Sequence, residues 1–186
     1  MKAMIKIMVV VAVTSVFLSF NPPAKASKLA ADKSRSSITY YMYHPAHDWS
    51  GTCKTISCNI LYNDSLKTIN SVAVVIPISC FNSDNANRDS HTLEATEALK
   101  YPMVKFVSSS ISNKDSVLTV SGNLTFHNVT KPISFTAKKR YAGKEMSVVG
   151  GFSIKLTDYS IAPPTLMMAA TEDLVKLEFT AVFKVN

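Results

Sequence analysis

Residues 118–126 read Leu-Thr-Val-Ser-Gly-Asn-Leu-Thr-Phe, and apolar or small side chains alternate with polar ones along the whole stretch. Successive side chains of an extended strand point to opposite faces of a sheet, so this period of two predicts a strand with one apolar face. Seven further segments alternate in the same way. They span residues 38–42, 56–62, 72–78, 104–106, 133–137, 146–156 and 175–183.

Turn signals separate several of these predicted strands. Residues 63–65 read Asn-Asp-Ser, residues 113–115 read Asn-Lys-Asp and residues 143–144 read Gly-Lys. Such residues favour tight turns, and short connections imply an antiparallel sheet. Eight strands with apolar faces and little helix to cover them must form a sandwich or close on themselves. Because closure removes exposed edges, we expect an all-β, eight-stranded antiparallel barrel.

A single helix candidate interrupts this pattern at residues 90–99. Asp89 or Ser90 can cap its start, and Tyr101-Pro102 marks its end. We expect this short helix to cap one end of the barrel.

The interior of an eight-stranded barrel is either filled by side chains or holds one slender ligand. Most predicted inward residues are large and apolar, but Gly122, Ala137 and Gly150 leave volume unfilled. This favours an internal ligand cavity. A filled core remains the alternative.

The first 26 residues have the organisation of a secretory signal peptide. Lys2 and Lys6 precede an apolar run over residues 7–20, and Ala24 and Ala26 supply the small side chains that a signal peptidase requires. We expect cleavage before Ser27, a single domain over residues 27–186, and a periplasmic or secreted protein. A retained N-terminal membrane anchor is the alternative.

The charge of the mature chain argues against nucleic acid as a partner. Residues 1–26 hold three Lys and no acidic residue, so their removal lowers the formal net charge from +7 to +4. The remaining basic residues are scattered, whereas phosphate binding requires a dense patch. The one basic run, residues 138–140, is interpreted as the solvated end of a strand.

Three cysteines in an exported chain predict one disulfide and one free thiol. Pairing Ile60 with Val72 across a hairpin sets Cys80 opposite Thr52, and a bulge would then bring Cys53 to Cys80. Cys53 and Cys58 would be about 17 Å apart on one extended strand, which is too far to bond. We therefore favour a Cys53–Cys80 disulfide, with Cys58 facing inward.

Candidate chemical groups are few. His44, His47 and His91 could be combined as metal ligands, but no Cys or carboxylate stands at ligand spacing, and loop histidines at the barrel rim explain them better. Asp89 and His91 would need a nucleophile to form an acid/base site, and none is evident. Nucleophile elbows and phosphate-binding loops are also missing from the sequence. We expect no catalytic residues, no metal and no cofactor.

Three stretches resemble the YceI-like family of exported lipid-binding proteins. Residues 87–91 read Asn-Arg-Asp-Ser-His, residues 100–106 Lys-Tyr-Pro-Met-Val-Lys-Phe, and residues 122–133 Gly-Asn-Leu-Thr-Phe-His-Asn-Val-Thr-Lys-Pro-Ile. The resemblance implies a lipocalin-like barrel whose apolar cavity binds a polyisoprenoid chain, such as a quinone tail. Two positions depart from the family: Asn128 replaces a usual Gly, and Leu-Thr-Asp-Tyr-Ser at residues 156–160 lacks the Arg of the family's Arg-x-x-Phe-Gly motif.

The expected function is therefore that of a binding protein for a hydrophobic or amphiphilic lipid, serving its transport, storage or sequestration, and not that of an enzyme. Transient membrane contact is expected, and the sequence does not decide between a monomer and a homodimer. A polar head group is placed near Trp49, Arg88 or His91. The expected wall residues are Tyr40, Met42, Ile76, Phe106, Leu124, Phe126, Phe135, Phe152 and Phe179.

Two other functions stay open at this point. One is an enzyme acting on a lipid or quinone, with Asp89 and His91 as its acid/base pair. The other is a packed-core interaction protein, for which Met167-Met168 would be an adaptable contact surface.

Overall fold

The computed structural model describes residues 26–166 and 169–185. The predicted signal segment and the Met167-Met168 contact surface therefore lie outside the described residues, apart from Ala26. The elements are β1 (Ala26–Ala30), β2 (Ser37–Met42), β3 (Trp49–Cys53), β4 (Ser57–Asn63), β5 (Thr68–Pro77), the 3-10 helix η1 (Ile78–Cys80), α1 (Ala86–Ala95), β6 (Met103–Lys114), β7 (Val117–Phe126), β8 (Val129–Ala142), β9 (Glu145–Lys155), the 3-10 helix η2 (Thr157–Tyr159), β10 (Thr165–Leu166), β11 (Ala169–Ala170) and β12 (Leu174–Lys184).

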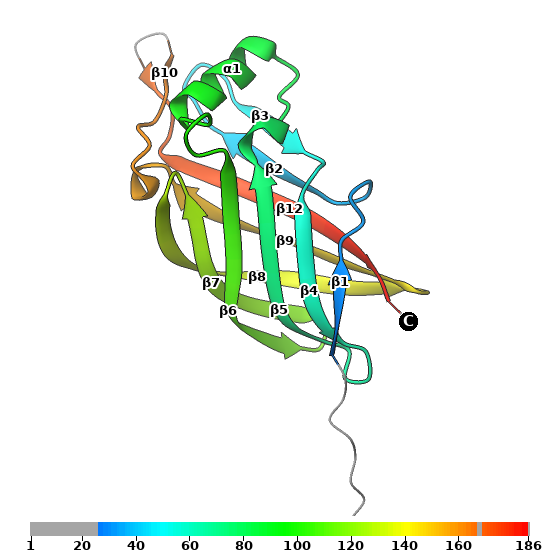
Figure 1. Cartoon of the computed structure of the whole chain (residues 1–186). Coiled ribbons are helices and arrows are strands. Elements are labelled where there is room, and N and C mark those ends of the chain that lie inside the picture. The colour runs from blue at the N-terminus through cyan, green and yellow to red at the C-terminus, as the bar shows by residue number, and fades with distance from the viewer. Residues whose placement is uncertain (1–25, 167–168, 186) are drawn as a thin grey trace, which may run out of the picture.

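Ten antiparallel strands form one sheet in the order β1-β4-β5-β6-β7-β8-β9-β12-β2-β3. The sheet curls into a barrel, and α1 lies across one end of it (Figure 1). The predicted all-β, antiparallel barrel with one capping helix is thus confirmed. Among the described residues, no helix is long and apolar enough to cross a membrane.

The N-terminal segment connects the two sides of the curled sheet. The main-chain N–H of Ala31 donates to Cys58 O at 2.8 Å, which extends the pairing of β1 with β4. The next N–H, that of Asp32, donates to Val182 O of β12 at 2.7 Å. One short segment therefore joins β4 to β12 and reduces the exposed edges that an open sheet would leave.

The expected strand count of eight was too low, because β1 and β3 also belong to the sheet. β1 reads Ala-Ser-Lys-Leu-Ala and β3 reads Trp-Ser-Gly-Thr-Cys. Neither segment carries a sustained alternation of large apolar side chains, so periodicity could not identify them. Their pairing with β4 and β2 decides their structure.

The helix begins four residues earlier than expected, at Ala86 instead of Ser90. The side chain of Asn85 caps it by accepting the main-chain N–H of Arg88 at 3.0 Å. Asp89, one of the expected caps, instead accepts a hydrogen bond from the Ser83 hydroxyl at 2.6 Å. A better-placed Asn therefore determines where the helix starts.

The β7–β8 turn explains how Asn replaces a glycine of the family pattern. His127 and Asn128 have φ values of 48° and 60°, so both residues adopt left-handed backbone. Two consecutive positive φ angles are typical of the two-residue turn that matches the twist of a hairpin, and Asn tolerates them better than most residues.

The β4–β5 register was predicted correctly, since Ile60 pairs with Val72. The structure also joins Cys53 to Cys80, the pair that the sequence favoured, and leaves Cys58 as a buried free thiol. The expected bulge is not what brings the two cysteines together. Cys53 ends β3 and Cys80 ends η1, and the neighbouring residues Thr52 and Asn82 form a bridge between these two segments.

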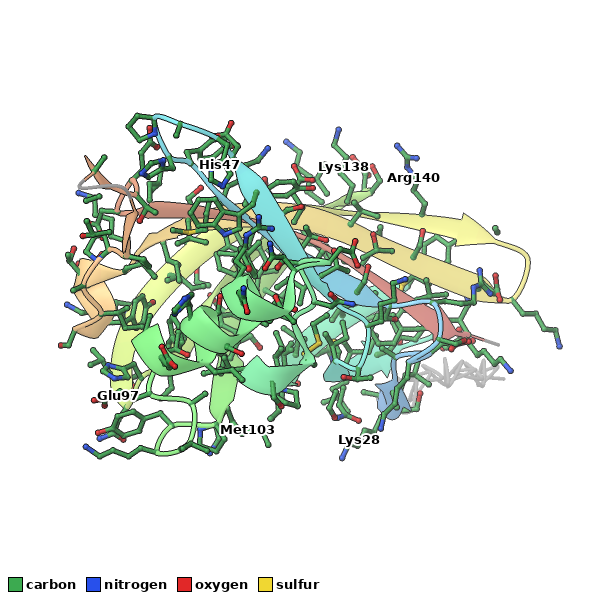
Figure 2. The ribbon with its side chains drawn as sticks, turned by 90° about the horizontal axis from the view of Figure 1, so that it is seen from above. Lys28, His47, Glu97, Met103, Lys138 and Arg140 are labelled. Carbon is green, nitrogen blue, oxygen red and sulfur yellow. A yellow bond between two sulfur atoms is a disulfide. The ribbon has the colours of Figure 1, made fainter. Side chains whose placement is uncertain are left out.

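The basic run at residues 138–140 is not wholly solvated. Lys138 and Arg140 extend away from the barrel (Figure 2), whereas Lys139 is only 6% exposed. These three residues belong to β8, where alternate side chains face the interior, so Lys139 lies on the same face as Phe135 and Ala137.

Candidate ligand-binding site

The barrel contains an apolar cavity of about 230 Å³. Its walls come from the inward faces of β2 to β9 and β12, together with residues of α1 and of the loops at that end. Ten of the twelve predicted ligand-binding residues line it, namely Tyr40, Met42, Trp49, Ile76, Phe106, Leu124, Phe126, Phe135, Phe152 and Phe179.

Four phenylalanines from different strands meet in the middle of the barrel. The ring of Phe135 lies 5.6 Å from that of Phe106, 5.2 Å from Phe152 and 5.7 Å from Phe179, measured between centroids. These separations suit favourable aromatic packing. The cluster forms a smooth apolar wall to which an aliphatic chain could bind.

Gly150 makes room for this cluster. A Cβ atom on Gly150 would lie 2.8 Å from Phe179 Cζ and 2.9 Å from Ala137 Cβ. The small residues that were expected to leave volume unfilled thus allow large rings from neighbouring strands to pack closely instead.

Helix α1 covers one end of the cavity, and Figure 2 looks down on this end. Thr92, Ala95 and Thr96 contribute to the cavity lining from this helix and the residue after it. Their spacing of three and four residues places them on one helical face. Sequence reasoning missed them because it assigned the lining to the strands alone, although all three residues lie within the helix predicted at residues 90–99 and their spacing was visible.

Arg88 lies at the rim instead of in the wall. Its guanidinium carbon is 5.5 Å from the centre of the Trp49 ring, a cation–π contact, and its Nη1 donates to Ser83 O at 3.3 Å. The structure thus brings Arg88 and Trp49 together at the covered end, as the expected head-group position requires.

His91 does not join them. Its side chain is 78% exposed on the outside of α1, where Nδ1 lies 3.2 Å from Glu94 Oε2. The carboxylate of Asp89 is bonded to Ser83 instead. The expected placement of His91 near a ligand head group is therefore wrong, and the two members of the hypothetical acid/base pair interact with different residues. Residues two positions apart point to nearly opposite faces of a helix, so Asp89 and His91 have different surroundings.

The other histidines considered as metal ligands also have structural partners. His44 Nδ1 accepts the Ala46 N–H at 3.0 Å, and its Nε2 lies 3.2 Å from Ala169 O. His47 is exposed, and its ring packs at a tilt against Trp49, with centroids 5.5 Å apart. Within residues 26–166 and 169–185, no three His, Cys, Asp or Glu side chains gather as a metal site.

Tyr40 is a polar exception in the apolar wall. Its ring packs edge-on against Phe81, with centroids 5.4 Å apart, and the residue is 9% exposed. Among the described residues its hydroxyl has no hydrogen-bond partner. Burial raises the pKa of this hydroxyl, so it remains protonated and can donate a hydrogen bond.

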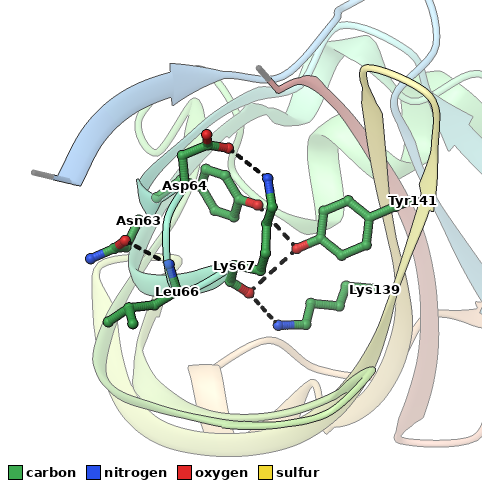
Figure 3. A network of polar contacts seen from close by, with 7 residues as sticks. Asn63, Asp64, Leu66, Lys67, Lys139 and Tyr141 are labelled. Carbon is green, nitrogen blue, oxygen red and sulfur yellow. Dashed lines mark hydrogen bonds and ion pairs between the residues drawn. The ribbon is translucent and has the colours of Figure 1, made fainter. Parts of the chain in front are cut away.

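The opposite end of the barrel is closed by a polar network (Figure 3). Lys139 Nζ donates to Lys67 O at 2.6 Å, and the Tyr141 hydroxyl donates to the same carbonyl at 3.4 Å. The hydroxyls of Tyr62 and Tyr141 lie 3.2 Å apart. These contacts hold the β4–β5 turn against β8, so the interior is closed at this end.

The free thiol of Cys58 lines the cavity. Burial raises its pKa to about 12, because an apolar site disfavours the thiolate. A protonated, buried thiol behaves as a small apolar wall residue.

Comparisons with known proteins give the same fold. The chain is 25% identical to the protein YceI of Salmonella newport (strain SL254) over 154 residues, which cover 78% of this chain and 81% of the relative. The solved structure of Burkholderia cenocepacia BcnA superposes with a TM-score of 0.73 at 18% identity, covering 82% of this chain and 98% of that one. A polyisoprenoid binding domain from Saccharophagus degradans superposes with a TM-score of 0.65 at 14% identity, covering 85% of this chain and 98% of that one.

The family assignment follows from a match that spans nearly the whole barrel. Residues 29–183 match the YceI-like domain, from the end of β1 to the end of β12. The barrel, its capping helix and its apolar interior are those of a protein that belongs to the YceI-like family.

Proposed function

We propose that this protein binds an amphiphilic polyisoprenoid-type lipid, such as an isoprenoid quinone or a precursor of one, for its transport, storage or sequestration. The observation that carries the proposal is the cavity inside the barrel, whose walls are almost wholly apolar. A hydrocarbon chain gains free energy there simply by leaving water. The structural similarity to a polyisoprenoid binding domain supports the choice of ligand class.

The size of the cavity favours a slender chain. Its volume of about 230 Å³ lies below the roughly 300–1,000 Å³ typical of small-molecule pockets. We therefore expect the wall side chains, led by the phenylalanine cluster, to shift when the ligand enters. Burial contributes about 0.8 kcal/mol per methylene, so two or three isoprene units can offset the cost of association without a charged anchor.

The site of action that we propose is the periplasm or the outside of the cell. Residues 1–26 have the pattern of a signal peptide, and the Cys53–Cys80 disulfide suits an oxidising compartment. Because such lipids are insoluble in water, loading and release would involve transient contact with a membrane.

The test is native mass spectrometry of the protein purified from its own periplasm, followed by lipid extraction and identification. We expect a stoichiometric isoprenoid lipid. Protein that is empty, and that also fails to take up added isoprenoid quinones, would refute the proposal and favour an interaction protein.

A pair of adjacent substitutions on β9 provides the control. Phe152 points into the cavity, and Ser153 is exposed on the outer face. Phe152→Asp should abolish lipid uptake, because a carboxylate in the apolar wall is costly, whereas Ser153→Asp should retain it. Retained uptake in a folded Phe152→Asp variant would show that the lipid binds elsewhere.

A further inference from the structure

The hydroxyl of Tyr40 requires an explanation, because buried polar groups in proteins are almost always hydrogen-bonded. Tyr40 is 9% exposed and lines the cavity, and its hydroxyl has no hydrogen-bond partner among residues 26–166 and 169–185. The Thr92 hydroxyl and the Trp49 indole lie close enough to influence its pKa, but neither bonds to it with normal geometry. A phenylalanine would fill the same space without an unpaired group.

The position of this hydroxyl is well defined. Tyr40 pairs with Gly51 across β2 and β3, and a Cβ atom on Gly51 would lie 2.5 Å from Tyr40 Cε1 and 2.8 Å from the hydroxyl oxygen. The ring therefore occupies the space that any other residue at position 51 would need. Phe81 packs edge-on against the same ring at 5.4 Å. The hydroxyl is thus held beneath the covered end of the barrel.

None of the polar groups near this hydroxyl, among the described residues, accepts its proton. The indole of Trp49 can only donate, and the guanidinium of Arg88 lies over the Trp49 ring. The Thr92 hydroxyl donates to Arg88 O at 2.9 Å. The nearest carboxylate, that of Asp89, is engaged by Ser83 at 2.6 Å. A ligand group that completes this arrangement would be an acceptor oxygen.

We propose that Tyr40 is a specificity-determining residue that donates a hydrogen bond to an acceptor oxygen of the bound lipid, and so selects isoprenoid carbonyl compounds over isoprenoid hydrocarbons. The inference rests on the proposed function and identifies the ligand class more closely. The apolar wall holds the chain of either kind of ligand, and the Tyr40 hydroxyl distinguishes between them.

The test compares two ligands of nearly equal apolar size: farnesylacetone, a ketone on a three-isoprene chain, and the hydrocarbon in which a methylene group replaces its ketone oxygen. Trp49 is the single tryptophan of the chain and lines the cavity, so its fluorescence reports binding. The unmodified protein should bind the ketone about fivefold more tightly, the value of one ordinary net hydrogen bond. Tyr40→Phe should remove this preference by weakening ketone binding and should leave hydrocarbon binding unchanged.

Tyr62→Phe is the matched control, because it deletes a hydroxyl that has a partner, Tyr141, at the closed end. This variant should keep the preference for the ketone. Without ligand, Tyr40→Phe should melt no lower than the unmodified protein, because no bond within the protein is lost. Equal affinities in the unmodified protein, a preference that survives Tyr40→Phe, or a lowered Tm of ligand-free Tyr40→Phe would each overturn the inference. Failure of both ligands to bind the unmodified protein would instead refute the proposed function.

Discussion

Breaking the Cys53–Cys80 disulfide should destabilise the barrel by an amount that its loop length predicts. The two cysteines are 27 residues apart in sequence. In the chain-entropy description, closing a loop of this length lowers the entropy of the unfolded chain and contributes about 3.5 kcal/mol at 25 °C. For a domain of this size the loss corresponds to a Tm lowered by about 7–14 °C.

The disulfide should also influence the binding site. It fixes the end of β3 to η1, and β3 carries both Trp49 and Gly51, the residue that packs against the Tyr40 ring. Phe81, which packs on the other part of that ring, directly follows Cys80. A loosened β3 should therefore weaken lipid binding in addition to lowering stability.

The assay is urea unfolding of the oxidised protein, the reduced protein and the double variant Cys53→Ala/Cys80→Ala. The reduced protein and the double variant should lose similar amounts of unfolding free energy. Cys58→Ala is the control, because it removes a cavity-lining thiol without touching the disulfide. If the unfolding free energy of the double variant lies less than about 1 kcal/mol below that of Cys58→Ala, the entropy argument fails for this loop.

Three further predictions concern the cavity and the closed end. Phe126→Asp should abolish lipid uptake while far-UV circular dichroism retains the β spectrum; uptake like that of the unmodified protein would contradict the assigned wall. Burial raises the pKa of the Cys58 thiol to about 12. In the folded protein near pH 8 this thiol should therefore react with a thiol reagent on the order of 10³-fold more slowly than in the urea-unfolded protein. Fast labelling of the folded protein would contradict its burial. Burial lowers the pKa of Lys139, so its charged form opposes folding, and its contribution to stability should rise with pH between that lowered pKa and the ordinary 10.5. Because Cys58 titrates with the opposite sign over part of this range, the test is the difference in unfolding free energy between Cys58→Ala and Cys58→Ala/Lys139→Met, which should shift in favour of Lys139 as the pH rises; a constant difference would contradict the burial of Lys139.

Much of the barrel could be predicted because period-two alternation is a local property of the chain. The stretch from Leu118 to Phe126 shows its inward face directly, and the structure places Leu118, Leu124 and Phe126 in the cavity wall. The Ile60–Val72 register could be derived from the hairpin alone. The alternation did not reveal β1 and β3, because neighbouring strands, and not their own side chains, hold these short segments extended.

The site was predictable in its wall but not in its polar details. Sequence periodicity states which side chains face inward, and that is sufficient to list an apolar lining. Sequence reasoning placed His91 near a head group at the rim, whereas α1, which begins at Ala86 after the Asn85 cap, carries His91 on its solvent-exposed side. It also treated Lys139 as solvated, although the β4–β5 turn covers it and offers the Lys67 carbonyl.

The sequence by itself determined the strand pattern, the apolar interior and the family. The tertiary structure alone decided that Tyr40 lies against Gly51 with a hydroxyl that no described residue pairs, that Arg88 lies over Trp49, and that Lys139 closes the far end. The physical reason is that facing direction repeats along a strand, whereas a hydrogen-bond partner comes from whichever distant segment the closed barrel brings near.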